Sequence, residues 1–144
     1  MPDPLQLEIA TPERLLVRER ASSVQLPGKD GYLGVLPGHA ALLSELATGT
    51  LAYVSGGQEH FLALNGGFAE VLNDHVRVLA DTAERAQEID VDRARAARER
   101  AQQRLVNPIL GIDIARALSA MTRAEARLRA AQQAGAGLPT EAGR

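Results

Sequence analysis

Short runs rich in Val, Leu and Thr recur along the first half of the chain, separated by Gly, Pro, Asn and Asp. They follow one another about every 8 to 12 residues, the spacing of strands in antiparallel sandwiches and barrels. Such a density of breakers excludes helices here. The pattern therefore predicts an antiparallel β domain from Leu5 to about Asp81. The runs are LQLEIA, ASSVQL, GYLGVL, TLAYVS, HFLAL, FAEVL and HVRVLA.

Two residue pairs between these runs mark tight turns. Gly56-Gly57 follows TLAYVS, and Asn73-Asp74 follows FAEVL. Glycine, asparagine and aspartate tolerate a positive φ, which a two-residue hairpin turn requires. We therefore expect each pair to close a hairpin.

The composition changes after Ala83. Residues 89–106 and 112–133 are dominated by Ala, Arg, Leu, Glu and Gln, which are strong helix formers. Asp90 and Asp113 are suited to be N-caps or first-turn anions of two helices. The β domain is therefore expected to be followed by a helical hairpin.

The ends of the predicted helices are marked by breakers. Asn107-Pro108 and Gly111 separate the two helices, and residues 135–137 end the second. The remaining residues, AGLPTEAGR after Gly135, are expected to form a frayed tail.

Each predicted helix carries an arginine stripe beside a stripe of small apolar residues, when about 100° is assigned to each residue. If the small stripes pack together, an antiparallel hairpin brings Asp90 and Arg93 near Arg123 and Arg127. The arginine stripes contain Arg93, Arg100 and Arg104 on the first helix and Arg116, Arg123 and Arg127 on the second. The small stripes contain Ala94, Ala97, Ala101 and Leu105, and Ala117, Ala120, Ala124, Leu128 and Ala131.

Converging guanidinium groups repel one another unless an anion lies between them, and Arg is suited to forked hydrogen bonds with phosphate. A polyphosphate would meet this need. The carboxylate of Asp90 could accept a hydrogen bond from an exocyclic amine such as that of adenine, which would make the anion a nucleotide. The alternative is that the arginines face water and the alanines only hold the hairpin together.

The net charge of -2 hides two oppositely charged halves. Residues 1–92 carry six basic and fourteen acidic side chains, whereas residues 93–130 carry nine arginines and three acidic side chains. This asymmetry favours an anionic partner for the hairpin, although a solvated basic face also fits it.

The composition excludes several kinds of chemistry. The chain contains no cysteine, which rules out disulfides, thiolate zinc sites and cysteine nucleophiles. Its three histidines are scattered, as surface or loop histidines are. No signal peptide and no run of about eighteen apolar residues is present, so we expect a cytoplasmic protein that can still dock onto a membrane complex.

Two long stretches resemble the epsilon subunit of bacterial F-type rotary ATP synthases. They are LPGKDGYLGVLPGHAALLSELATGTL (26–51) and NGGFAEVLNDHVRVLADTAERAQEID (65–90), and an Ala/Arg helical pair follows them. The resemblance covers about residues 5–131. Ala41 departs from the pattern, because many members have proline there.

The resemblance implies a fold and a role for each segment of the chain. The fold is an N-terminal antiparallel β-sandwich of about ten strands followed by a C-terminal two-helix antiparallel hairpin. Residues 1–86 would form the rotor-binding sandwich, residues 87–134 the regulatory hairpin and residues 135–144 a flexible tail.

The implied function is that of a central-stalk subunit without chemistry of its own, in the proton-translocating ATP synthase. The sandwich would bind gamma and the membrane rotor ring of c subunits, at the cytoplasmic face of the bacterial inner membrane. The hairpin would leave the enzyme free when it is folded on the sandwich. When extended along gamma it would reach the catalytic beta and alpha subunits and block ATP hydrolysis.

Some members of this family bind ATP in the folded state through the pattern I-D-x-x-R-A-x-x-A-x-x-R-A. The specified positions are matched here by Ile89, Asp90, Arg93, Ala94, Ala97, Arg100 and Ala101, and Glu84, Arg123 and Arg127 match further ligand-contacting residues of those members. The resemblance thus implies ATP as a regulatory ligand, with no required cofactor and no metal. A rotor subunit whose hairpin binds no nucleotide is the alternative.

Two other classes of protein fit less well. The segment GKDGYLG has neither the G-x-x-x-x-G-K-[ST] nor the G-x-G-x-x-G pattern, and no serine has a G-x-S-x-G setting, which argues against an enzyme. The acidic β domain and the 3% of aromatic residues argue against nucleic-acid binding. If the alanine stripes packed between molecules, a dimer would form.

Overall fold

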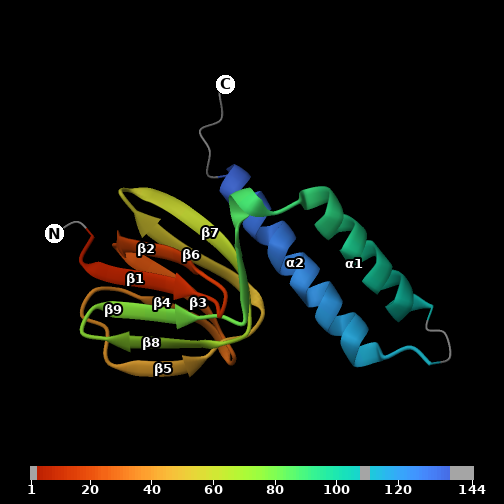
Figure 1. The fold of residues 1–144 in the computed structure, drawn as a ribbon, viewed down its shortest axis with the longest axis horizontal. Coiled ribbons are helices and arrows are strands. Elements are labelled where there is room, and N and C mark those ends of the chain that lie inside the picture. Colours follow the sequence, from red (N-terminus) through yellow and green to blue (C-terminus); the bar gives the residue numbers. More distant parts are fainter. Residues whose placement is uncertain (1–2, 108–110, 137–144) are drawn as a thin grey trace, which may run out of the picture.

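The computed structural model describes residues 3–107 and 111–136, which form a β domain and a pair of helices lying beside it (Figure 1). The strands are β1 (Leu5–Ala10), β2 (Leu15–Ala21), β3 (Ser23–Gly28), β4 (Gly31–Val35), β5 (Leu42–Glu45), β6 (Gly49–Ser55), β7 (Gln58–Asn65), β8 (Phe68–Leu72), β9 (His75–Leu79) and β10 (Thr82–Arg85). A 3-10 turn, η1 (Ala86–Glu88), leads to the helices α1 (Val91–Val106) and α2 (Ile114–Ala136).

The ten strands form two five-stranded sheets, which confirms the sandwich. The first, called sheet A below, has the order β2-β1-β9-β8-β5, and the second, sheet B, has the order β10-β7-β6-β3-β4. One detail differs from the purely antiparallel prediction, because β1 and β9 pair in parallel. The two strands are far apart in the sequence, and local patterns do not report the direction of such a pair.

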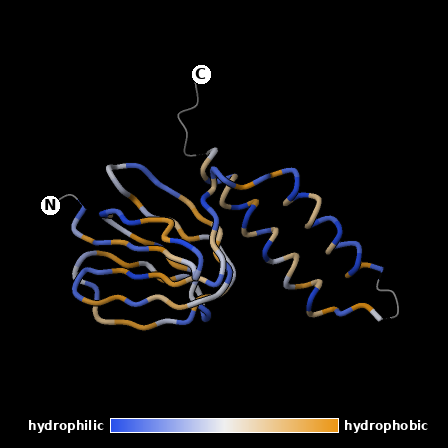
Figure 2. The backbone as a smooth tube through the Cα atoms, in the orientation of Figure 1, coloured by the Kyte–Doolittle hydropathy of each residue, from blue (hydrophilic) through white to orange (hydrophobic). Residues whose placement is uncertain are grey.

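The core lies between the two sheets and is built by alternation along each strand. Leu5, Leu7 and Ile9 of β1 are buried, whereas Gln6 is exposed and Glu8 is half-buried on the other face. Figure 2 shows this alternation as orange and blue segments along the strands. Side chains of successive strand residues point to opposite faces, so one apolar face is sufficient to form a core.

Strand β7 is buried on both faces. Leu62 and Leu64 belong to the core between the sheets, whereas Phe61 and Ala63 lie on the opposite face in a cluster with residues of α2. Helix α2 packs against β6 and β7, and α1 packs against α2 (Figure 1). This arrangement explains why the run HFLAL is apolar at consecutive positions, as expected for a strand covered on both sides.

Both predicted hairpin turns are confirmed. Gly56 and Gly57 have φ values of 61° and 77°, and β6 pairs with β7 up to Ser55 and Gln58. Asn73 and Asp74 have φ values of 49° and 61° between β8 and β9.

The apolar runs noted in the sequence did not include three strands, β2, β5 and β10, and each of them lies at the edge of a sheet. An edge strand has only one paired neighbour and is often charged, which weakens its apolar signal. Strand β2, for example, has the sequence LLVRERA and exposes three consecutive charged residues.

The two helices and their caps are confirmed, with shifted ends. Helix α1 begins at Val91 rather than Ile89, because the side chain of Asp90 accepts a hydrogen bond from the Arg93 amide at 3.1 Å and caps the helix. Asp113 accepts an equivalent bond from the Arg116 amide at 3.1 Å. Helix α2 continues to Ala136, so the predicted tail begins at least two residues later, and residues 137–144 lie outside the described residues.

No helix in the described part of the chain is both long and apolar enough to cross a bilayer.

Candidate functional site

Helix α2 lies on sheet B through small side chains. Ala126 and Ala130 are buried against Phe61 and Ala63 of β7, and Ile89 completes the cluster from the linker before α1. Small residues let the helix axis approach the sheet closely, and the burial of their methyl groups contributes only modestly per residue. Ala126 and Ala130 were missing from the predicted stripes, although Ala131, which packs against the same cluster, was included.

The predicted alanine seam between the helices is confirmed within one chain. Ala94 and Ala101 of α1 are buried, as are Ala117 and Ala124 of α2, and each pair is separated by seven residues. A spacing of seven places two residues on the same side of a helix. Helix α2 therefore has two buried sides, one against α1 and one against sheet B.

Glu84 of β10 and Arg127 of α2 form an ion pair across the boundary between sandwich and hairpin. Their side chains are 36% and 37% exposed, so the pair is only partly shielded from water. Arg123 lies beside them and lines the same small pocket of about 60 Å³. The structure thus brings together three of the predicted site residues, Glu84, Arg123 and Arg127.

The other predicted site residues do not line this pocket. Arg93 and Arg100 are exposed on α1, the carboxylate of Asp90 caps α1, and Ile89 is 8% exposed in the apolar cluster. Asp90 and Arg93 are therefore not among the residues that line the pocket of Arg123 and Arg127, and the clamp expected from the helical wheels stays a prediction. Ligand pockets usually measure several hundred Å³. A nucleotide bound to all these residues would require the pocket to widen.

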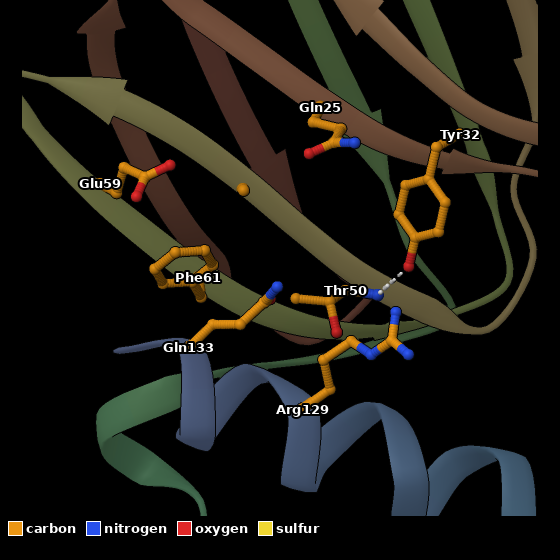
Figure 3. A pocket seen from close by; sticks show the side chains of 8 residues that line it. Gln25, Tyr32, Thr50, Glu59, Phe61, Arg129 and Gln133 are labelled. Carbon is orange, nitrogen blue, oxygen red and sulfur yellow. Dashed lines mark hydrogen bonds between the residues drawn. The ribbon is translucent and has the colours of Figure 1, made fainter. Parts of the chain in front are cut away.

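A larger cleft of about 420 Å³ lies between sheet B and the C-terminal half of α2. Figure 3 shows Arg129 and Gln133 approaching it from α2, opposite Gln25, Tyr32 and Glu59 of the sandwich. No pattern in the sequence singles out these residues, because they come from four separate elements and share no motif. In the described residues no group of three or more histidine and acidic side chains gathers that could hold a metal ion.

At the edge of this cleft a buried threonine joins sandwich and hairpin. The Thr50 hydroxyl of β6 donates a hydrogen bond of 3.2 Å to the main-chain carbonyl of Ala126 in α2. The Thr50 amide donates to the Tyr32 hydroxyl at 3.2 Å, which Figure 3 shows as a dashed line. This contact also had no signal in the sequence.

The outer face of sheet A is not covered by either helix (Figure 1) and carries an exposed apolar row. Leu15, Leu79 and Phe68 are 51%, 56% and 54% exposed. The strand register places them side by side, through the pairs Leu15 with Ala10, Ala10 with Leu79, and Leu79 with Phe68. A contiguous apolar row of this kind is typical of a protein interface.

A charged row runs beside the apolar one on the same face. Glu8 accepts hydrogen bonds from Arg18 at 3.0 Å and from Arg77 at 3.3 Å. The hydrogen bond from Arg18 is the main cause that lowers the pKa of Glu8 below its ordinary value, and Arg77 adds to it. The outer face therefore combines apolar contact area with fixed charges, the composition of a specific docking surface.

Two family models match adjacent parts of the chain. Residues 4–86 match the beta-sandwich domain of the ATP synthase delta/epsilon chain, and residues 87–132 match its long alpha-helix domain. The chain belongs to the ATP synthase delta/epsilon family. The resemblance noted in the sequence is thereby confirmed.

The relatives of this delta/epsilon chain include proteins from several bacteria. It is 61% identical to the ATP synthase epsilon chain of Solibacter usitatus over 133 residues, which cover 92% of this chain and 99% of the relative. It is 52% identical to the ATP synthase epsilon chain of Moorella thermoacetica over 128 residues, covering 88% and 96% of the two chains.

Solved structures of mitochondrial ATP synthases share the fold. A chain in the Euglena gracilis OSCP/F1/c-ring structure superposes with a TM-score of 0.77 and 26% identity, covering 92% of this chain and 83% of that one. A chain in the Tetrahymena thermophila central stalk/c-ring structure superposes with a TM-score of 0.56 and 16% identity, covering 91% and 96%.

The two family models meet at η1, where one ion pair and several hydrogen bonds hold the linker of this delta/epsilon chain. The guanidinium of Arg14 donates to both carboxylate oxygens of Glu88, at 3.1 and 3.3 Å, and the Arg85 amide donates to Glu88 at 3.1 Å. These bonds, led by that of Arg14, lower the pKa of Glu88. The Arg85 side chain bonds the Leu16 carbonyl of β2. The linker is thus fixed to sheet A while the hairpin beyond it contacts sheet B.

Replacing Glu84 by Gln tests the ion pair that joins the sandwich to α2. The change keeps the shape and removes the charge opposite Arg127, so we expect the free energy of unfolding to fall by about 0.5–1 kcal/mol at low salt. The difference should shrink in high salt because the pair is partly exposed. Urea unfolding followed by circular dichroism would measure it. Glu99→Gln, at an exposed carboxylate of α1, is the matched control, and equal effects of the two variants would contradict the assignment.

Proposed function

We propose that this chain is a non-catalytic subunit of the central stalk of a bacterial proton-translocating ATP synthase, where it couples the membrane rotor ring to gamma. The observation that carries the proposal is the match of both family domains in order over residues 4–132. The relatives named epsilon chain are matched over nearly their whole length, which supports a subunit of the same extent. Such a subunit is peripheral to the membrane, at its cytoplasmic face.

The uncovered face of sheet A is the surface that we assign to the rotor partners, gamma and the ring of c subunits. The opposite face of the sandwich is occupied by α2, whereas the face with Leu15, Leu79 and Phe68 offers an exposed apolar row on a sheet. Burial of such a row would supply much of the binding free energy, and the adjacent charges of Glu8 and Arg77 would orient the partner.

Phe68→Asp tests this surface. A charge buried in an apolar interface remains unpaired, so the affinity of the chain for purified gamma should fall at least about tenfold. Titration calorimetry would measure the affinity, after circular dichroism has shown that the variant is folded. Leu118→Asp, at a similarly exposed leucine of α2, should leave the affinity unchanged. An equal loss in both variants, or in neither, would contradict the assignment of the docking surface.

The hairpin, in this proposal, inhibits ATP hydrolysis when it leaves the sandwich. Its nine arginines between residues 93 and 130 would then meet acidic segments of the catalytic beta and alpha subunits. The small side chains at its interface with sheet B support a reversible contact, since each contributes little to docking.

ATP is the proposed regulatory ligand of the docked hairpin. The candidate site consists of Glu84, Ile89, Asp90, Arg93, Arg100, Arg123 and Arg127. A ligand that binds only the docked state stabilises it by RT ln(1 + [ATP]/Kd). A high ATP concentration would therefore keep the hairpin docked on the sandwich and prevent inhibition. The guanidinium of Arg127 bonds Glu84 through its Nε in this structure, so phosphate would bind it through the terminal nitrogens or displace Glu84.

Titration of the purified chain with ATP and ADP tests the nucleotide site. We expect saturable binding that prefers ATP and weakens at least about tenfold in Arg123→Gln and in Arg127→Gln, since each variant removes a charge-assisted hydrogen bond. Arg129→Gln is the control, because Arg129 lies on the same helix but lines the other cleft. Absence of heat at millimolar ATP would favour the alternative, a rotor subunit whose hairpin binds no nucleotide.

A further inference from the structure

Thr50 is the only buried polar residue in the described part of the chain, at 4% exposure. It lies on β6 and faces α2, because its neighbour Leu51 and the next alternate residue Tyr53 face the core between the sheets. Its hydroxyl does not bond within the sandwich. It donates to the carbonyl of Ala126, 76 residues away in the sequence and on the other domain.

This hydrogen bond has a directional role that the apolar contacts around it cannot play, and the partly exposed Glu84–Arg127 pair is a second directional bond between the two domains. The surrounding cluster consists of Phe61, Ala63, Ala126 and Ala130, whose apolar contacts are not directional. A hydrogen bond weakens steeply when its geometry departs from the optimum. The Thr50 hydroxyl therefore fixes one position of α2 along sheet B.

Contacts within the sandwich hold Thr50 in place. The Thr50 amide donates to the Tyr32 hydroxyl, which reaches it past Gly49. A Cβ at Gly49 would lie 2.7 Å from the Cβ of Pro27 and 3.0 Å from the Tyr32 hydroxyl, so a side chain there would displace this support. The donor is thus positioned by β3, β4 and β6 independently of the helix that it bonds.

We propose that Thr50 is the latch of the hairpin, the residue whose hydroxyl sets how much of the protein has α2 docked on sheet B. This inference rests on the proposed function, in which the hairpin leaves the sandwich as a unit. Without the hydroxyl, the docked state loses one buried hydrogen bond while the free state, whose groups bond water, loses nothing comparable. The ratio of free to docked hairpin should then rise about fivefold, the effect of one net hydrogen bond.

The test uses the absence of native cysteine. Ala63→Cys places a thiol on β7 beneath α2, at a residue that is 7% exposed, and its modification by a thiol reagent reports hairpin release. Ala69→Cys places a thiol in the core between the sheets, at 1% exposure, where modification requires unfolding of the sandwich. The rates are measured on the full chain, with each probe combined with Thr50→Val or Thr50→Ser.

The expected result is that Thr50→Val raises the modification rate at position 63 about fivefold and changes the rate at position 69 less. Thr50→Ser, which keeps the hydroxyl, should stay within about twofold of the parent at both probes. If position 63 reacts faster than position 69 but its rate is the same with and without Thr50→Val, the proposed role of Thr50 is wrong, while release of the hairpin from the sandwich is supported. If both positions react at the same rate in the parent, the hairpin does not move separately, and the latch fails together with the proposed regulation.

Discussion

The contact of α2 with sheet B is the interaction on which the arrangement of the two domains depends. Strand β7 is apolar on both faces, so the sandwich buries one face by itself and needs a second layer over Phe61 and Ala63. Alanines at positions 126 and 130 supply that layer with little apolar area. With this cover in place Phe61 and Ala63 are each 7% exposed. Helix α1 depends on the same contact indirectly, because its main packing partner is α2.

Electrostatic attraction is a second interaction between the sandwich and the hairpin. The sandwich is acidic and the hairpin is basic, and in this structure their opposite charges meet at Glu84 and Arg127. In the proposed function, Arg127 would bind a carboxylate of its own chain, a nucleotide phosphate or a carboxylate of a catalytic subunit. Since a guanidinium forms forked bonds with either group, these partners compete for the same hydrogen-bond donors.

Local patterns in the sequence predicted much of the fold. Alternating runs, two-residue turns and helix-capping aspartates all act over a few residues, and the corresponding elements are present in the structure. The alanine seam at Ala94 and Ala124 could also be predicted, because it follows from helical periodicity. The edge strands were not singled out, since charged residues such as those of β2 weaken the alternation.

Contacts between distant segments could not be predicted in this way. The bond from Thr50 to Ala126 and the cleft beside Arg129 depend on how α2 is laid across sheet B, and no periodicity reports that placement. Glu84 and Arg127 were both candidates, yet their pairing with each other was not foreseen. The capping role of Asp90 could be predicted from the local sequence, but the helical wheels could not show that Arg127 would pair with Glu84 of β10.

The central claim is that one chain combines a fixed rotor domain with a hairpin that acts only when released. Cysteines at positions 63 and 126, both in the buried contact between sheet B and α2, would allow the hairpin to be locked by oxidation in the assembled ATP synthase. ATP synthesis and ATP hydrolysis would be measured before oxidation, after it and after reduction, with each single-cysteine variant as control. If the hairpin inhibits only when released, the locked enzyme keeps ATP synthesis and loses inhibition of hydrolysis, and reduction restores the inhibition. Inhibition that persists unchanged in the locked enzyme would contradict it.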